Sequence, residues 1–212
     1  GNYDDVVDKS ELTMADRWII ARCEDTVRDA TAAYERFRLN DAAQTVHRFI
    51  WSDLADWYVE IIKPRLYGDL PGGDVARAVV PQTFDVALRL LHPVMPFITE
   101  TLWRRLPGRG EDQSISIAPW PASDRRAVNT DALRRFGVLQ ELVGAIRSIR
   151  AEYGVEPGQS VRATVQTGSE PARATLRENE SVVLRLAKLS SLDISPKSAE
   201  SPEDAATAVL AD

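Results

Sequence analysis

Aromatic and arginine side chains occur close together in the sequence, and these two residue types suit the recognition of unpaired nucleic-acid bases. A guanidinium offers planar, bidentate donors to phosphates and base edges, and an aromatic ring offers a face on which a base can stack. The densest group follows Arg48 and comprises Phe49, Trp51, Trp57 and Tyr58. One helix stripe cannot bury so many rings, so some must face another helix or a ligand. Core packing is the competing interpretation, because tryptophan is the largest core residue.

Groups that could do covalent or acid–base chemistry are few. Cys23 lies on an apolar helix stripe, where a thiol is buried and inert. Asp53 and Asp56 lie on adjacent helical turns, where salt bridges to arginines of neighbouring helices are a better interpretation than catalysis. His47 is expected at the surface, and His92, which precedes a proline, is expected to cap a helix end. The sequence contains no glycine-rich nucleotide motif, no nucleophile elbow and no zinc-type spacing.

The composition is that of a globular protein, with 212 residues, 44% hydrophobic and 27% charged. The net charge of -6 counts against general nucleic-acid affinity, because such domains are commonly basic. Most of the 26 basic residues are arginine, which predicts either a local RNA-binding face or a coding bias. The single cysteine suits a reducing cytosol, and no apolar run approaches the roughly 18 residues of a membrane span.

Hydrophobic periodicity predicts two long helices at the start of the chain. Apolar residues three and four apart predict a helix over 13–37, with Thr13 as its N-cap. A second helix starts near residue 40, and Pro64 is expected to end or kink it. Its buried stripe is expected to comprise Val46, Ile50, Leu54, Trp57 and Ile61.

Two further helices complete a predicted bundle. The third follows a loop over 69–74, and Pro81 predicts a kink in it or a later start. The fourth begins at Pro96, which suits the first position of a helix. The residues of the fourth helix expected in the core are Ile98, Leu102 and Leu106. Four helices joined by short loops predict an antiparallel-leaning bundle.

The second half of the chain mixes strands with helices. The expected elements are a short strand at 114–117, a long helix over 130–153, a half-buried strand at 161–165, one or two helices over 170–189, a strand at 192–194, and the start of a third strand at 207–210. The fold class is therefore mainly α, with a small α/β module after the bundle. The expected divisions are a leader over 1–12, a helical-bundle domain over 13–123, a connecting long helix within 124–159, and the α/β module over 160–212.

Several segments carry motifs in addition to periodicity. Residues 49–60 read FIWSDLADWYVE, 91–103 read LHPVMPFITETLW, 118–121 read APWP, and 146–158 read IRSIRAEYGVEPG. The second motif resembles a helix-loop-helix shared by the valyl-, isoleucyl- and leucyl-tRNA synthetases. The first resembles the anticodon-binding bundle of the valyl-tRNA synthetases, which belong to class I. The third resembles the link that follows the helix-loop-helix, and the last resembles the helix that leads into the α/β module of the valyl enzymes. The matches keep the family order over roughly residues 13–195.

The resemblance implies that the parent protein is an ATP-dependent ligase that charges tRNA with valine, and that this chain holds the anticodon. The two ATP-site signatures, His-Ile-Gly-His and Lys-Met-Ser-Lys-Ser, do not occur here. The chain is therefore expected to be non-catalytic and to carry no cofactor, with ATP and Mg²⁺ used by the parent enzyme. The family's coiled-coil arm is also missing. The implied partners are the anticodon arm of tRNA(Val) and the catalytic domain of the same protein, in the cytoplasm and without a membrane.

Seven residues are candidates for RNA contact. They are Arg17, Arg28, Phe37, Arg38, Phe97, Arg147 and Arg150. The first two lie about three turns apart on the first helix and off its apolar stripe, where pairing with Glu24 or Asp25 is the alternative. The two phenylalanines begin or end helices, and an aromatic ring beside arginines suits an unpaired base. Burial of both rings in the core is the alternative. The last two arginines belong to the 146–158 motif.

Two other functions compete with this interpretation. The first is the equivalent domain of an isoleucyl- or leucyl-tRNA synthetase, against which the segments 56–58 and 146–152 argue. The second is a helical protein-interaction module without an RNA function. Such a module would have an exposed apolar patch and no face lined by arginines.

Overall fold

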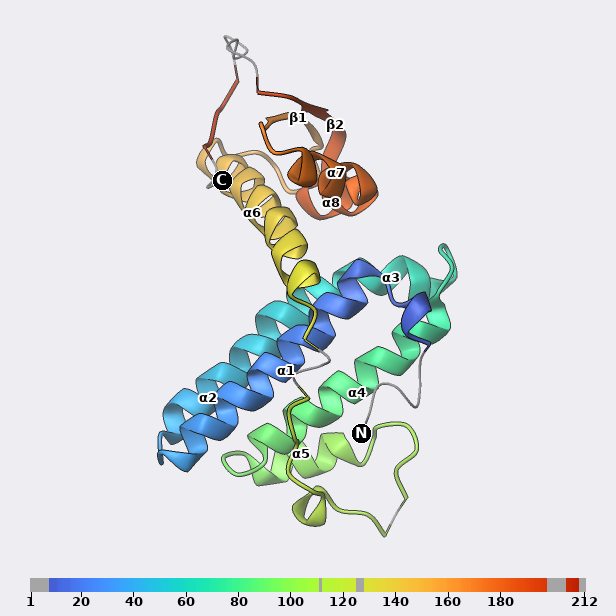
Figure 1. Ribbon diagram of the computed structural model, residues 1–212, viewed down its shortest axis with the longest axis vertical. Helices are drawn as coiled ribbons and strands as arrows, with labels where there is room; N and C mark the ends of the chain where they lie inside the picture. The colour runs from blue at the N-terminus through green and yellow to red at the C-terminus, as the bar shows by residue number, and fades with distance from the viewer. Residues whose placement is uncertain (1–7, 111, 125–127, 198–204, 210–212) are drawn as a thin grey trace. The chain divides into compact units, whose positions relative to one another are not determined.

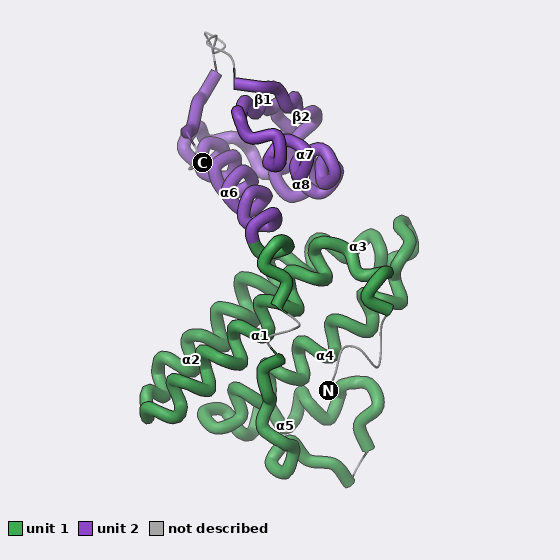
Figure 2. Tube along the Cα trace, in the orientation of Figure 1, with its two compact units in different colours: residues 1–133 green, residues 134–212 purple. Residues whose placement is uncertain are grey.

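The computed structural model describes residues 8–110, 112–124, 128–197 and 205–209 (Figure 1). The chain forms two compact units, Gly1–Leu133 and Arg134–Asp212 (Figure 2). The division falls inside a long helix, α6 (Thr130–Glu152). The connecting helix expected within 124–159 is therefore shared between the units.

Unit 1 is helical, as the sequence predicts. Its helices are α1 (Met14–Glu35), α2 (Leu39–Arg48), α3 (Glu60–Tyr67), α4 (Gly73–Leu91) and α5 (Pro96–Trp103), with a π-helix, η3 (Phe49–Val59), between α2 and α3, and two short 3-10 turns, η2 (Lys9–Glu11) and η4 (Ile115–Ile117). Helix α1 packs against α2, η3 and α4 (Figure 1). The largest fully buried side chains of the unit are Trp18, Ile19, Val46, Phe49, Tyr58, Ile62, Val79, Leu88 and Leu90. Cys23 is also fully buried, which confirms its predicted burial.

A buried ionic network fixes the start of α1. The Thr13 hydroxyl accepts from the Asp16 N–H at 3.3 Å, and the Asp16 carboxylate accepts from the Thr13 N–H at 2.8 Å, which confirms the predicted cap. The same carboxylate accepts from the Tyr58 hydroxyl at 2.6 Å and from the Arg65 guanidinium at 2.8 Å. Burial raises the pKa of the Tyr58 phenol, so it stays a donor. Arg65 also donates to the Gly72 carbonyl at 2.9 Å, which ties α1, η3, α3 and the start of α4 together.

The π-helix η3 changes which side chains of the second long helix are buried. In a π-helix each N–H bonds to a carbonyl five residues back, so the turn is wider than in an α-helix. The spacing of four or five residues buries Phe49, Leu54 and Tyr58. The 3.6-residue period predicted Ile50 and Trp57 instead, and both are only half-buried. That part of the predicted stripe is wrong, because the hydrogen-bonding pattern changes at Phe49.

Neither helical proline ends its helix. The chain continues past Pro64 to Tyr67 and stops at Gly68, whose φ of 90° favours glycine. Helix α4 begins at Gly73, before Pro81 rather than after it. Both helices bury side chains beyond the proline, and tertiary packing of this kind supplies most of a helix's stability.

Helix α5 and the turn after it differ from the prediction. The buried residues of α5 are Thr99 and Trp103, whereas Ile98 is 45% exposed. Leu102 and Leu106 pack partly against the cluster of Leu88, Trp103 and Ile115, so they match the prediction in part. Residues 114–117 form the turn η4 and not a strand. The Glu100 carboxylate accepts from the Ser114 hydroxyl and the Ile115 N–H, so a side chain holds this backbone in place of a partner strand.

Unit 2 is a small α/β module. It contains β1 (Val161–Gln166), α7 (Glu170–Glu178), α8 (Glu180–Ala187) and β2 (Leu189–Ser195), together with most of α6. The two strands pair in parallel, from Val161 opposite Leu189 to Gln166 opposite Ser195. These elements confirm the predicted strands and helices. Residues 207–209 have no strand structure, and Leu210 lies outside the described residues. No helix in the described part of the chain is long and apolar enough to cross a membrane.

Candidate nucleic-acid interface

Large hydrophobic side chains are exposed mainly at one end of unit 1. Seven such residues lie there, in the turn between α1 and α2, at the start of α2, before α5 and in its first turn, in η4 and just beyond it. They are Phe37, Leu39, Met95, Phe97, Ile98, Ile117 and Trp120. Phe37 is 90% exposed and Phe97 is 88% exposed, so neither ring is part of the core. We call these seven residues the aromatic end.

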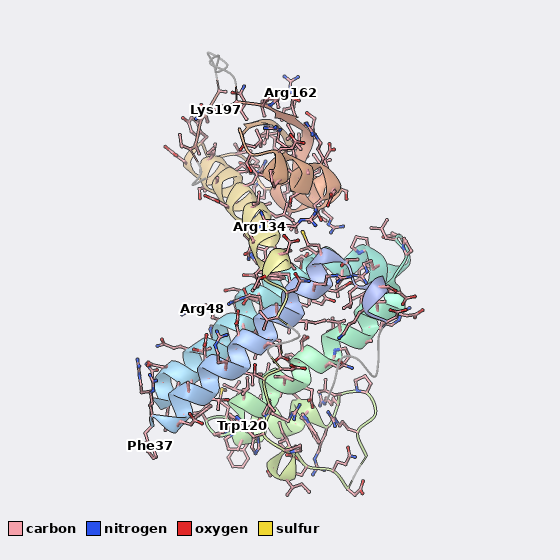
Figure 3. All side chains as sticks on the ribbon, in the orientation of Figure 1. Phe37, Arg48, Trp120, Arg134, Arg162 and Lys197 are labelled. Atoms are coloured by element: carbon pink, nitrogen blue, oxygen red, sulfur yellow. The ribbon has the colours of Figure 1, made fainter. Side chains whose placement is uncertain are left out.

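Side-chain contacts bring these segments together. The Tyr34 hydroxyl, near the end of α1, donates to the Leu90 carbonyl near the end of α4 at 2.9 Å. Burial raises the pKa of this phenol, which keeps it a donor. The Trp120 ring packs edge-on against Tyr34 with centroids 5.4 Å apart, and its indole N–H donates to the Thr31 hydroxyl at 3.0 Å. Figure 3 shows Phe37 and Trp120 at this end of the unit.

The backbone at Phe37 holds its ring in solvent. Phe37 has a φ of 56°, in the left-handed region that costs a non-glycine residue about 1–2 kcal/mol. The turn is closed by hydrogen bonds from the Phe37 N–H to Tyr34 and from the Arg38 N–H to Ala33, both 2.9 Å. An exposed ring gains no packing to offset this cost. Strain of this kind at an exposed residue points to a function for the side chain.

Arginines flank the exposed ring. Arg36 is the C-cap residue of α1 and is exposed. Arg38 is 62% exposed and forms an ion pair with Asp41. The turn therefore presents one ring between two guanidinium groups. Arg36 was not among the sequence candidates, although its position beside Phe37 is a signal that could have identified it.

A hydrogen-bonded triad positions the start of α5. The Thr99 hydroxyl donates to the Met95 carbonyl at 2.8 Å, so its oxygen accepts from His92 Nδ1 at 2.8 Å. His92 Nε2 then accepts from the Ser116 hydroxyl at 3.2 Å. The ring therefore links α4, α5 and η4 and does not cap a helix end as predicted. These links hold the first turn of α5, which carries Phe97.

The two candidate arginines of α1 have partners within the protein. Arg28 pairs with Asp25 at 2.6 Å and Asp29 at 2.9 Å, and these hydrogen bonds raise its pKa. Arg17 donates to the carbonyls of Lys9 and Leu12, at 2.8 and 3.1 Å. The pairing of Arg28 with Asp25 matches the alternative that the sequence offered. The two hydrogen bonds of Arg17 hold the segment that precedes α1.

The remaining two candidate arginines lie in unit 2. Arg147 donates to the Leu186 carbonyl at 3.1 and 3.3 Å. Arg150 is 9% exposed and donates to the carbonyls of Gln159 and Glu156, at 2.7 and 3.1 Å. Their donors thus hold the end of α8 and the loop before β1. Of the seven candidates, Phe37 and Arg38 are exposed in the turn between α1 and α2, and Phe97 is exposed in the first turn of α5.

The acidic groups of unit 1 serve structural contacts. Arg22 pairs with Asp53 at 2.9 Å, as expected for a salt bridge between neighbouring helices. Burial raises the pKa of Asp53, and Arg22 opposes that shift. Within the described residues, no group of three or more His, Cys, Asp or Glu side chains could hold a metal ion. The aromatic end therefore fits a stacked ligand better than an acid–base or metal-assisted reaction.

Comparisons with known proteins agree with this chemistry. Residues 16–165 match the family model described as the anticodon-binding domain of tRNA ligase. The chain is 41% identical over 205 residues to the valine–tRNA ligase of Carboxydothermus hydrogenoformans, which covers 97% of the chain and 23% of that relative. It is 40% identical to the Geobacter sulfurreducens enzyme, over 98% of the chain and 24% of the relative. The chain thus spans less than a quarter of the length of these relatives. It belongs to the family of anticodon-binding domains of tRNA ligases.

Proposed function

We propose that the aromatic end of unit 1 binds the anticodon loop of tRNA(Val), within a cytoplasmic valine–tRNA ligase that attaches valine to tRNA using ATP. Phe37 and Phe97 serve as stacking surfaces for unpaired bases. Arg36 and Arg38 contact phosphates or base edges beside Phe37. The observation that carries the proposal is the pair of almost fully exposed phenylalanine rings, one of them between two arginines.

The chemistry of an anticodon loop fits this end of the unit. Loop bases can be splayed from their stack and placed on aromatic rings, and each such contact contributes about 1–3 kcal/mol. The chain's net charge of -6 opposes RNA at long range. Binding therefore depends on the local arginines and should weaken as salt screens them. Arg17, Arg147 and Arg150 are not included because they donate to backbone carbonyls, and Arg28 is not included because it pairs with two carboxylates, whereas Arg38 pairs with one.

The chain contributes recognition rather than catalysis to the proposed ligase. Neither ATP-site signature of the class occurs in the sequence. The clusters of carboxylates and histidines that would hold Mg²⁺ are not found among the described residues.

A titration of the 212-residue chain with an anticodon stem-loop tests the proposal. Binding should weaken about 5- to 100-fold in Phe37→Ala and in Phe97→Ala, the range expected for one lost stacking contact. Replacing the valine anticodon with another should weaken the parent chain's binding. Arg36→Gln and Arg38→Gln should each lower the slope of log affinity against log salt by about one if they contact phosphates.

Arg77→Gln is the matched control, because Arg77 is exposed on α4 and pairs with Asp74 outside the aromatic end. It should leave affinity and salt slope unchanged. If the stem-loop does not bind at low salt, or binds Phe37→Ala and Phe97→Ala as well as the parent, the proposal is wrong. The exposed hydrophobic residues would then indicate a protein-interaction module.

A further inference from the structure

An exposed stripe of unusual composition runs along α2 into η3. Asn40, Gln44, His47 and Trp51 are spaced four, three and four residues apart, so they share one helix face. All four are exposed, and Trp51 is 64% exposed. Arg48 is exposed beside His47, as Figure 3 shows on the outer side of α2. We call these five residues the α2 stripe.

The two rings of the stripe are arranged before any ligand binds. The His47 and Trp51 rings are nearly parallel, with an interplanar angle of 7° and centroids 5.9 Å apart. His47 therefore supports the indole, most of whose surface remains open to solvent. Within the described ranges, the Arg48 guanidinium forms no hydrogen bond or ion pair, and its charge opposes the rise in the pKa of the buried Asp53 carboxylate. Its N–H groups can therefore donate to a ligand.

The composition of the stripe fits neither a solvated helix face nor a face for another protein. A solvated face typically carries charged residues of both signs, and the stripe has no carboxylate and no lysine. A helix that docks in a protein groove presents several apolar anchors at this spacing, and Trp51 is the single large apolar residue of the stripe. Amides and guanidinium groups bind base edges and phosphates, and stacked rings accept bases. Asp56, exposed one π-helical turn after Trp51, ends the stripe.

The stripe starts at the aromatic end. Asn40 lies three residues after Phe37, and the helical rise places Trp51 about 16 Å beyond Asn40. A strand that leaves Phe37 therefore meets Asn40 and Gln44 before it reaches the ring pair. This continuity distinguishes the stripe from other exposed positions on unit 1.

We propose that the α2 stripe binds the RNA strand as it leaves the aromatic end, with an unpaired base stacked on Trp51 and a phosphate bound by Arg48. The inference rests on the proposed function and extends the same interface. The occupant is single-stranded RNA continuous with the loop held at Phe37 and Phe97. The stripe adds a second stacking position and does not replace the first.

The test uses the 212-residue chain and two RNAs, the anticodon stem-loop and an unpaired oligonucleotide that carries the loop sequence with added nucleotides on both sides. Trp51→Ala should weaken binding of the longer RNA about 5- to 100-fold. Trp51→Phe, which keeps a stacking ring, should restore most of that affinity. Tyr67→Ala is the matched control, because Tyr67 is an aromatic residue 77% exposed on α3. It should bind like the parent.

Fluorescence adds a direct readout of stacking. Saturating RNA should quench tryptophan emission in a Trp120→Phe variant, and further replacement of Trp51 by Phe should remove that quenching. If Phe37→Ala weakens binding while Trp51→Ala does not, the inference is overturned and the proposed function stands. If the parent chain binds neither RNA, both the inference and the proposed function are wrong.

Discussion

At the scale of single residues, the structure shows which aromatic side chains are exposed and which are buried, a distinction that the sequence did not provide. Phe37 and Phe97 are almost fully exposed, whereas Phe49 and Tyr58 are fully buried. The exposure of Phe37 comes from a left-handed backbone conformation, which the sequence predicts only for glycine or asparagine.

Phe37→Gly should therefore separate stability from recognition. Glycine adopts a φ of 56° without strain, so the free energy of unfolding should rise by up to about 1 kcal/mol, after the entropy of the unfolded chain is counted. Affinity for the anticodon stem-loop should fall, because the stacking ring is gone. Urea unfolding and an RNA titration on the same preparation measure both effects. An unfolding free energy lower by more than 1 kcal/mol would show that the ring packs after all.

A second residue-scale prediction concerns Arg65. Arg65→Met should destabilise the chain by about 3–5 kcal/mol, because it leaves the fully buried Asp16 carboxylate without its cationic partner. Arg77→Met, at an exposed ion pair on α4, should cost no more than about 0.5 kcal/mol. Chemical denaturation of both variants provides the comparison. Equal stability of the two would mean that the buried network contributes little.

At the scale of elements, buried carboxylates set part of the pH response. Glu24 on α1 is 7% exposed and accepts from the Asp124 N–H at 2.6 Å. Burial raises the pKa of Glu24 above its usual 4.5. The folded state thus holds this proton more tightly than the unfolded state. Protonated Glu24 therefore stabilises the folded state fully below pH 4.5, and this stabilisation is lost as the pH rises through the raised pKa of Glu24.

Glu24→Gln should remove this dependence. Gln cannot titrate, so the variant should gain stability relative to the parent as pH rises from 4.5 to neutrality. Other carboxylates contribute equally to both proteins and cancel in the difference. Urea unfolding of both proteins at several pH values measures this difference in the free energy of unfolding. A difference that is flat with pH would mean that Glu24 titrates normally.

At the scale of the whole molecule, recognition and catalysis are expected to separate. The chain matches less than a quarter of the valine–tRNA ligases to which it is similar, in the region of their anticodon-binding domains. The 212-residue chain should show no valine-dependent pyrophosphate exchange, because it has neither ATP-site signature. Exchange above the level of a mock preparation would contradict this expectation.

The sequence by itself determined the features that depend on neighbouring residues. Spacing and capping are local properties. The sequence therefore predicted the helical period of α1, its cap at Thr13, the long helix α6 and the two strands of unit 2. The motifs at 49–60 and 91–103 likewise indicated the family. The strand predicted over 114–117 failed because its backbone finds a distant side-chain partner. The Ile115 N–H donates to the Glu100 carboxylate, and the segment forms the turn η4.

Only the tertiary structure decided which rings and arginines face solvent. The wide turn of η3 buries Tyr58 against Asp16 of α1 and leaves Trp51 outside. Arg150 has the same chemistry as Arg36, yet its donors are engaged by carbonyls of a loop several residues away. Burial and hydrogen-bond partners depend on segments brought together from distant parts of the chain. For that reason residue type and spacing alone could not assign these side chains to the core or to the surface.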